Sequence, residues 1–222
     1  MGLNYVKPGS NMYQFINATW NTVKGECPHG CTYCYMKRWG KQKPVRFDEK
    51  ELKTDLGSGN TIFVGSSCDL FAEDIDLSWI IATLQYCCKF DNTYLFQTKN
   101  PERMAFYHKY FPEKTKLCTT IETNRIYPNY MGNTPEPEMR AIQMTQFIKW
   151  DAFVTIEPIM DFDLYELVKL IKLCHPQQVN IGADSGNNHL PEPSKEKILA
   201  LIEELKKFTV IDQKRNLKRL PC

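Results

Sequence analysis

Short apolar runs alternate with segments of helical periodicity along most of the chain. The runs typical of buried parallel strands lie at residues 61–64, 93–98, 116–121, 152–156 and 178–181. An earlier strand is predicted within residues 13–23. Helices are predicted at residues 48–56 and, from caps and apolar spacing, after residues 76, 100, 134, 163 and 194. Six strands alternating with six helices predict a parallel α/β sheet with right-handed crossovers.

This pattern leaves two architectures open, a partly closed barrel and an open doubly wound sheet. No Gly-x-Gly-x-x-Gly turn follows any predicted strand, so nothing supports a dinucleotide-binding fold. At 222 residues, the chain fits a single domain, with a core at about residues 14–208 and a basic tail at residues 209–222.

Composition is that of a globular protein with a sizeable core, because 42% of residues are hydrophobic and 24% are charged. The net charge of +2 does not by itself indicate a nucleic-acid binder, so the partner class stays open. We recognise no signal peptide and no membrane-spanning stretch. We therefore expect a cytoplasmic protein without a membrane partner.

Three cysteines lie close together in the segment Cys-Pro-His-Gly-Cys-Thr-Tyr-Cys that starts at Cys27. With Cys31 and Cys34 they form a C-x3-C-x2-C loop that can point three sulfurs at one metal centre. An all-cysteine [4Fe–4S] site uses four thiolates, so three would leave one iron without a protein ligand. Two alternatives remain: His29 could complete a Cys3His zinc site, or the thiols could be ordinary core residues.

The other six cysteines have simpler interpretations. Nine cysteines are an odd number, and we expect no disulfide framework. Cys68 lies in a predicted strand-exit loop, where it could donate a hydrogen atom or simply be a small packing residue without a chemical role. The terminal Cys222 is expected to be free. Helix faces and a strand place the remaining thiols in the core: Cys87, Cys88, Cys118 and Cys174.

Polar residues follow several predicted strands, where ligands of parallel α/β proteins gather because the exit loops converge on one face. Glu157 ends the fifth strand, and its carboxylate could accept hydrogen bonds from ribose or from an ammonium group. A solvated carboxylate at a strand end is the alternative. Asp69 and Asp184 lie in exit loops and could face substrate or simply form turns.

The cysteine loop resembles that of the radical S-adenosylmethionine (SAM) superfamily, whose motif is C-x3-C-x-aromatic-C after the first barrel strand. Tyr33 fills the aromatic position. The resemblance implies a partial (β/α)6 barrel of the TIM type and a [4Fe–4S] cluster whose free iron chelates SAM. It also implies an external electron donor of the flavodoxin or ferredoxin type and hydrogen-atom abstraction by a 5′-deoxyadenosyl radical. The cofactors then carry the difficult chemistry while the protein binds and orients them.

The same resemblance implies positions that would contact SAM. Gly65, Ser66 and Ser67 occupy the place of a turn that takes the SAM amino group, although the usual Gly-Gly-Glu is absent. Glu122 and Asn124 end the fourth strand, where members of the superfamily bind the ribose or methionine end of SAM. The adenine region is matched by two residues, Ile181 and Gly182.

Pieces at residues 19–22, 63–66 with 69–71, 97–101, 156–158 and 182–186 look like those of small radical SAM proteins from phages and bacteria. A more distant likeness to spore photoproduct lyase makes a nucleotide or nucleic-acid base a candidate substrate. The basic segment from Lys37 to Arg46, with Trp39 inside it, could follow a phosphate backbone or be a solvated surface. Two rival functions remain open: a zinc-stabilised nucleic-acid-binding module without catalysis, and a degenerate fold that binds a cluster but no SAM.

Overall fold

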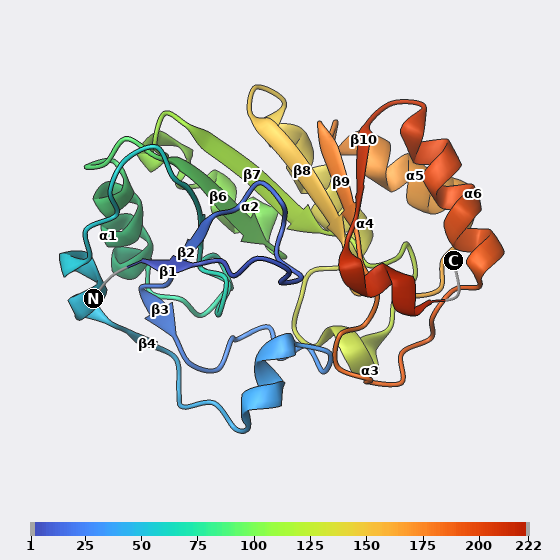
Figure 1. Cartoon of the computed structure of the whole chain (residues 1–222), viewed down its shortest axis with the longest axis horizontal. Helices are drawn as coiled ribbons and strands as arrows, with labels where there is room; N and C mark the ends of the chain where they lie inside the picture. Colours follow the sequence, from blue (N-terminus) through green and yellow to red (C-terminus); the bar gives the residue numbers. More distant parts are fainter. Residues whose placement is uncertain (1–2, 221–222) are drawn as a thin grey trace.

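One curved sheet of eight strands forms the centre of the molecule (Figure 1). The structure is a computed structural model that describes residues 3–220, so the expectation for Cys222 lies outside the described residues. The sheet has the order β1-β2-β5-β6-β7-β8-β9-β10. Its strands are β1 (Asn4–Tyr5), β2 (Ala18–Trp20), β5 (Thr61–Val64), β6 (Thr93–Thr98), β7 (Thr115–Thr120), β8 (Asp151–Ile156), β9 (Gln178–Ile181) and β10 (Val210–Gln213).

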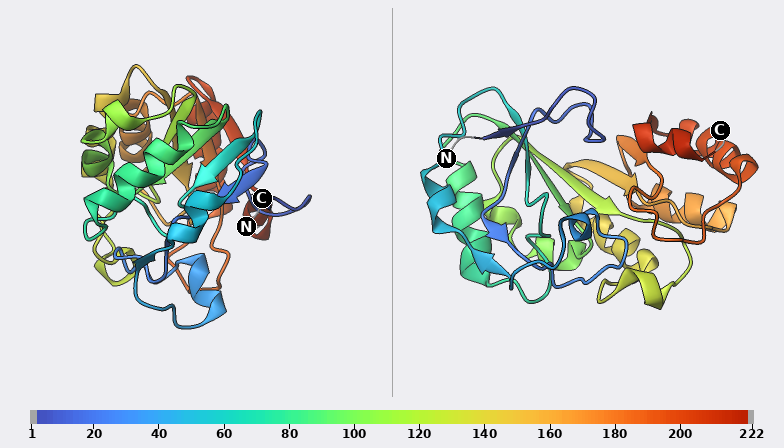
Figure 2. Two further views of the ribbon diagram at one scale, coloured as in Figure 1. Left: turned by 90° about the vertical axis from the view of Figure 1, so that its left-hand side faces the viewer. Right: turned by 60° about the horizontal axis from the view of Figure 1, so that its bottom comes forward.

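The strand order decides between the two predicted architectures. From β5 to β10 every strand pairs with the next one along the chain, and all pairs from β2 onward are parallel. A doubly wound sheet would reverse its order at a switch point. The helices lie along the outside of the curved sheet instead (Figure 2). The fold is therefore the predicted partial TIM-like barrel.

Five main helices cover the outer face, and shorter ones lie in the connections. The main helices are α1 (Leu77–Cys87), α2 (Pro101–Ala105), α4 (Pro137–Met144), α5 (Leu164–Leu173) and α6 (Lys195–Lys206). The shorter ones are α3 (Pro128–Met131), η1 (Tyr35–Trp39), η2 (Glu49–Lys53), η3 (His108–Tyr110), η4 (Thr145–Phe147) and η5 (Arg215–Arg219). Asp76, Asn100 and Ser194 cap α1, α2 and α6 with their side chains. No described helix is both long and apolar enough to cross a membrane.

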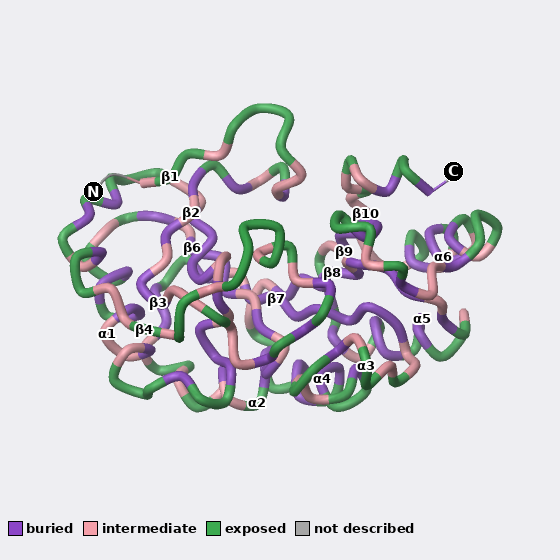
Figure 3. The backbone as a smooth tube through the Cα atoms, turned by 90° about the horizontal axis from the view of Figure 1, so that it is seen from below, coloured by how far each residue is buried: buried purple, intermediate pink, exposed green. Residues whose placement is uncertain are grey.

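Alternating residues of the strands divide the core into two faces. Phe63, Leu95, Cys118 and Phe153 point to the concave side, where they pack with Tyr13 and with the N-terminal segment around it. Their neighbours along the strands belong to the larger core beneath the helices. Buried residues follow the strands, whereas exposed residues follow the outer loops (Figure 3). The two faces of the sheet thus carry separate apolar clusters, the smaller one on the concave side.

Several predicted boundaries are wrong. The first strand covers only Ala18–Trp20, because residues 13–16 form a turn in which the Ile16 N–H donates to the Tyr13 carbonyl at 3.0 Å. The predicted helix at residues 48–56 is the short 3-10 helix η2. The helix expected from residue 134 begins at Pro137, and the expected loop at residues 125–134 contains α3.

Both ends of the sheet hold strands that were not predicted. β1 pairs antiparallel with β2, and a separate two-stranded sheet joins β3 (Val23–Lys24) to β4 (Arg46–Phe47). The segment predicted as a basic tail contains β10 and η5, and it buries Leu217 and Leu220. These edge strands are only two to four residues long, which leaves too little apolar alternation to detect.

Stability should depend strongly on the aromatic packing under the helices. Phe96 is fully buried and stacks on Phe111 with ring centroids 5.6 Å apart. We expect Phe96→Ala to lower the free energy of unfolding by about 3–5 kcal/mol because it leaves a cavity in a close-packed core. Tyr165→Ala, at a residue 79% exposed, should change it by less than about 0.5 kcal/mol. Urea unfolding measures the change in free energy of unfolding for each variant. Equal changes for the two variants would contradict this packing.

Candidate active site

A cavity of about 1070 Å³ opens at the carboxyl ends of the parallel strands. The cysteine loop contributes Cys27, Cys31 and Cys34, and Tyr33 lies beside them. Strand-exit loops contribute the predicted residues Gly65, Ser66, Ser67 and Glu157. Eight of the predicted site residues, from distant parts of the sequence, therefore meet at one cavity.

The cysteine loop is held from one side by α3 and the residues that follow it. The Thr32 N–H donates to the Tyr130 carbonyl at 2.9 Å, and the His29 carbonyl accepts from the Asn133 N–H at 2.7 Å. Between these bonds lies Gly132, with φ +64°, where an added Cβ would stand 2.1 Å from the His29 carbonyl oxygen. Only glycine allows the two backbones to approach so closely.

Beneath the loop lies a fully buried carboxylate, that of Glu122. It pairs with Arg140 from α4 and with Lys99 after β6, each at 2.7 Å, and it accepts a hydrogen bond from the Tyr33 hydroxyl. Burial alone would raise the pKa of Glu122, but Arg140 and Lys99 outweigh burial and lower it to about 2. This network ties Tyr33, inside the cysteine motif, to two strand exits and a helix.

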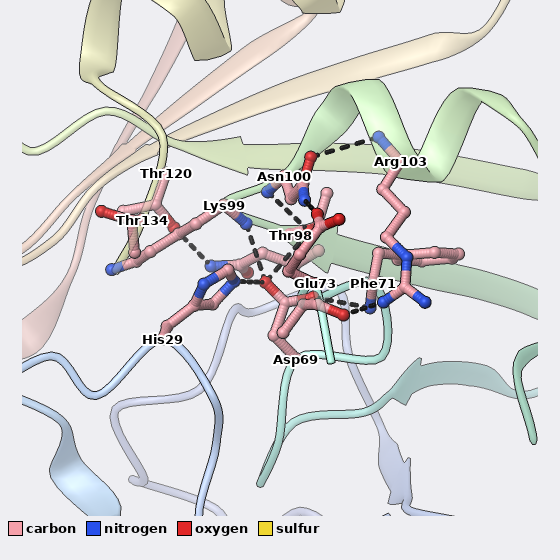
Figure 4. Close-up of polar contacts among 12 residues, drawn as sticks. His29, Asp69, Phe71, Glu73, Thr98, Lys99, Asn100, Arg103, Thr120 and Thr134 are labelled. Carbon is pink, nitrogen blue, oxygen red and sulfur yellow. Dashed lines mark hydrogen bonds and ion pairs between the residues drawn. The ribbon is translucent and has the colours of Figure 1, made fainter. Parts of the chain in front are cut away.

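A second polar anchor joins His29 to Asp69, in the loop after β5 (Figure 4). The His29 Nε2 atom lies 2.8 Å from the Asp69 carboxylate. The same carboxylate accepts hydrogen bonds from the Thr98 hydroxyl at 3.0 Å and from the Lys99 N–H at 2.8 Å. Burial opposes the charged imidazolium, but Asp69 raises the pKa of His29 above its ordinary value. His29 therefore braces the cysteine loop through Asp69.

The Cys68 side chain is buried beside the cysteine loop. The neighbouring Cys68 thiol lowers the pKa of Cys27 below the ordinary value for cysteine, which favours the thiolate, the form that binds metals. Burial raises the pKa of Cys31. The positive charge of Lys99 opposes this rise and compensates negative charge at the cysteine loop.

The loop after β5 is fixed by a residue that the sequence did not single out. The Asn21 side-chain carbonyl accepts from the Ser67 N–H at 3.0 Å and from the Ser66 hydroxyl at 3.2 Å. The Tyr35 hydroxyl donates to the Ser66 carbonyl at 2.5 Å, so this carbonyl already has one partner. Gly65, at φ +77°, makes the tight turn that this arrangement requires.

Glu157 lines the cavity and is held by residues from both ends of the chain. Its carboxylate accepts hydrogen bonds from Asn11 at 2.8 Å, Asn216 at 2.7 Å and Lys214 at 2.5 Å. These three partners come from segments where we predicted no site residue, and only their polar character near the chain ends could have suggested them. The carboxylate has about four lone-pair sites and retains room for one further donor.

Four predicted residues do not line the cavity. Glu122 lies below its wall, in the charge network. The Asn124 side chain accepts from the Asp163 N–H at 2.8 Å, just before α5, and donates to the Asp163 carboxylate. Ile181 belongs to the core beneath the helices, and Gly182 backs onto the Glu157 side chain. Their predicted contacts with SAM stay predictions.

The other candidate residues also have defined places in the structure. Asp184 lines the cavity and accepts from the backbone N–H of Gly186 at 2.9 Å, as expected of a turn residue. Cys87, Cys118 and Cys174 are buried, as predicted, whereas Cys88 is exposed. Among residues 3–220 no three His, Cys, Asp or Glu side chains converge as the ligands of one metal ion would. A [4Fe–4S] cluster requires no such convergence, because each thiolate binds a different iron.

The family described as "Protein of unknown function (DUF5131)" matches residues 10–196, which is most of the chain. The chain belongs to this family. Its matched part includes the cysteine loop and the exits of β5, β6, β7, β8 and β9. A search of curated protein sequences found no significant match.

Solved structures of spore photoproduct lyase have a similar fold. A cysteine-to-serine variant aligns with a TM-score of 0.63 and 12% identity, over 95% of this chain and 80% of that one. A cysteine-to-alanine variant gives a TM-score of 0.65 and 11% identity, over 95% and 81%. A double variant with bound AdoMet and dinucleoside spore photoproduct aligns with a TM-score of 0.58 and 12% identity, over 93% of this chain and 66% of that one. The DUF5131 chain thus shares the fold of these enzymes at low identity.

The buried charge network should govern both stability and its dependence on pH. We expect Glu122→Gln to lower the free energy of unfolding by about 3–5 kcal/mol, because it leaves Arg140 and Lys99 without a buried counter-charge. The pKa of Glu122 is depressed on folding, so its contribution is present above the ordinary value of 4.5 and is lost as pH falls toward 2. Urea unfolding from pH 7 downward should show the gap to wild type narrowing.

A matched control is Glu192→Gln, which removes a carboxylate from the more exposed ion pair with Arg219. It should cost less than about 1 kcal/mol at neutral pH. A gap for Glu122→Gln that stays constant or widens as pH falls would contradict the assignment.

The close approach of Gly132 to the cysteine loop is also testable. We expect Gly132→Ala to destabilise the protein several times more than Gly59→Ala. Both glycines have positive φ, but an added Cβ at Gly59 meets nothing within 4 Å. The control should therefore show only backbone strain of about 1–2 kcal/mol. Thermal unfolding measures the difference, and equal losses would show that α3 does not constrain the loop.

Proposed function

We propose that this protein is a radical SAM enzyme. The observation that supports it most is the meeting of three thiols from a C-x3-C-x2-C loop with four strand-exit residues at one cavity. Ligands of parallel α/β folds bind at this edge. The shared fold with spore photoproduct lyase supports the same proposal.

The chain's own residues fit the expected groups. Cys27, Cys31 and Cys34 would hold a [4Fe–4S] cluster, and the depressed pKa of Cys27 suits a thiolate ligand. Gly65, Ser66, Ser67 and Glu157 would contact SAM from the cavity wall. When bound, the cluster and SAM supply one electron from an external flavodoxin- or ferredoxin-type donor and a 5′-deoxyadenosyl radical that removes a hydrogen atom from substrate.

The role of the protein is to position the cysteine loop and to balance the negative charge of its thiolates. Tyr33 and His29 hold the cysteine loop from inside, through Glu122 and Asp69. Lys99 places a buried positive charge near Cys31, which offsets the charge of bound thiolates. A cytoplasmic location accords with eight described cysteines that are all unpaired. A nucleotide-like substrate is the candidate, since three of the similar solved structures hold a dinucleoside spore photoproduct.

Anaerobic reconstitution with iron and sulfide, followed by dithionite and SAM, tests the proposal. We expect wild type to bind both elements and to release 5′-deoxyadenosine. Alanine substitution of Cys27, Cys31 or Cys34 should reduce this product to background, whereas Cys88→Ala, at an exposed thiol on the outer face, should not. Liquid chromatography quantifies the product.

Two results would contradict the proposal and favour a rival. A colourless protein with stoichiometric zinc would support the zinc-stabilised module. A protein that binds a cluster yet forms no 5′-deoxyadenosine would support the degenerate fold without SAM.

A further inference from the structure

A basic segment projects beside the cavity, and we call residues 35–47 the flap. In Figure 1 it begins as the blue helical turn below the strands, η1. It carries five cationic residues and no acidic one: Lys37, Arg38, Lys41, Lys43 and Arg46. Their five charges exceed the +2 of the whole chain, so the rest of the chain is net negative. Positive charge is therefore concentrated here.

These charges are not neutralised within the protein. Among residues 3–220, none of the five forms an ion pair, although acidic partners are found for Lys24, Lys99, Lys114, Lys116, Lys197 and Lys214. Lys206, at the end of α6, and Lys207, its C-cap, pair even with glutamates three residues before them. Unpaired cations crowded into one short segment repel one another, and a polyanion bound there would relieve that repulsion.

Aromatic rings lie within the same segment. The Trp39 side chain is 61% exposed, and the Arg38 guanidinium lies 4.7 Å from its ring centroid and 5.4 Å from that of Tyr35. The bond from the Tyr35 hydroxyl to the Ser66 carbonyl fixes this group to the cavity wall. An exposed indole with a stacked guanidinium offers a flat surface on which a base can stack.

The flap also forms part of the cavity wall. Tyr35, Lys37, Arg38 and Lys41 line the cavity together with the three cysteines. Tyr5, which is 67% exposed, also lines the cavity. The cavity volume of about 1070 Å³ slightly exceeds the ~300–1,000 Å³ typical of small-molecule sites, which leaves room for part of a substrate beside a cofactor.

We propose that the flap binds single-stranded nucleic acid and presents one base to the cavity. This inference deepens the proposed function by naming the substrate class of the same site. The cations would contact phosphates while Trp39 and Arg38 stack on a neighbouring base. A base stacked within a duplex cannot reach the cavity at the ends of the β-strands. The nucleic acid must therefore be single-stranded there, or the base must be flipped out of the duplex.

Fluorescence anisotropy with a labelled thymidine oligomer of about 12 nucleotides tests this inference, since single-strand sites span about 4–16. We expect Trp39→Ala to weaken binding by roughly 5- to 150-fold through lost stacking. The triple variant Lys37→Ala, Arg38→Ala, Lys41→Ala should reduce the slope of log affinity against log salt by about 2, at about 0.7 for each contact. A duplex of equal length serves as the comparison, and it should bind more weakly than the single strand.

Matched controls remove the same groups elsewhere. The triple variant Lys195→Ala, Lys206→Ala, Lys207→Ala, on α6 and its C-cap, removes equal charge, and Tyr165→Ala removes an exposed aromatic ring. Neither control should lower affinity by more than about 2-fold, since neither site faces the cavity. Flap variants that match these controls would overturn the inference. So would competition by polyglutamate equal to that by the oligomer, which would indicate an acidic protein partner.

The binding assay needs neither SAM nor a reductant, so it is independent of the activity assay. Oligomer binding without 5′-deoxyadenosine would retain the flap assignment and reject the radical reaction. Product formation without oligomer binding would retain the reaction and reject nucleic acid as the substrate class.

Discussion

A carboxylate removed completely from water needs positive partners, and in this protein that requirement joins the site together. Glu122 follows β7, Lys99 follows β6, Arg140 lies on α4, and Tyr33 lies between two cysteines. Displacing Arg140 or Lys99 would leave the buried charge of Glu122 only partly compensated, and displacing Tyr33 would remove a hydrogen bond from its carboxylate. The cysteine loop is therefore anchored to the barrel through these side chains, although it contains little regular structure of its own.

A second pair of contacts, one steric and one electrostatic, also fixes the cysteine loop. Gly132 allows α3 to press against the loop backbone, and Asp69 holds His29 from the other side. Both contacts leave the three thiols facing the cavity. Catalytic sites are often built on loops positioned by a rigid scaffold, and this arrangement shows how the scaffold can be extended into a loop.

The sequence was informative wherever chemistry is local. Apolar runs predicted the six central strands, and the spacing of Cys27, Cys31 and Cys34 pointed to one site. Exit loops were found because parallel strands bring their carboxyl ends together. Long-range partners were not predictable: Arg140 on a helix looks like any solvated arginine, and nothing local links Asn11 and Asn216 to Glu157. The edge strands were missed because pairing, not periodicity, defines such short elements.

The central claim is that three cysteines hold a cluster with one iron open to SAM. Electron paramagnetic resonance of the anaerobically reconstituted, dithionite-reduced protein, recorded before and after SAM is added, tests it most directly. The account predicts a reduced [4Fe–4S] signal that changes shape when SAM binds. A protein that takes up no iron and sulfide, or a signal that SAM leaves unchanged, would contradict it.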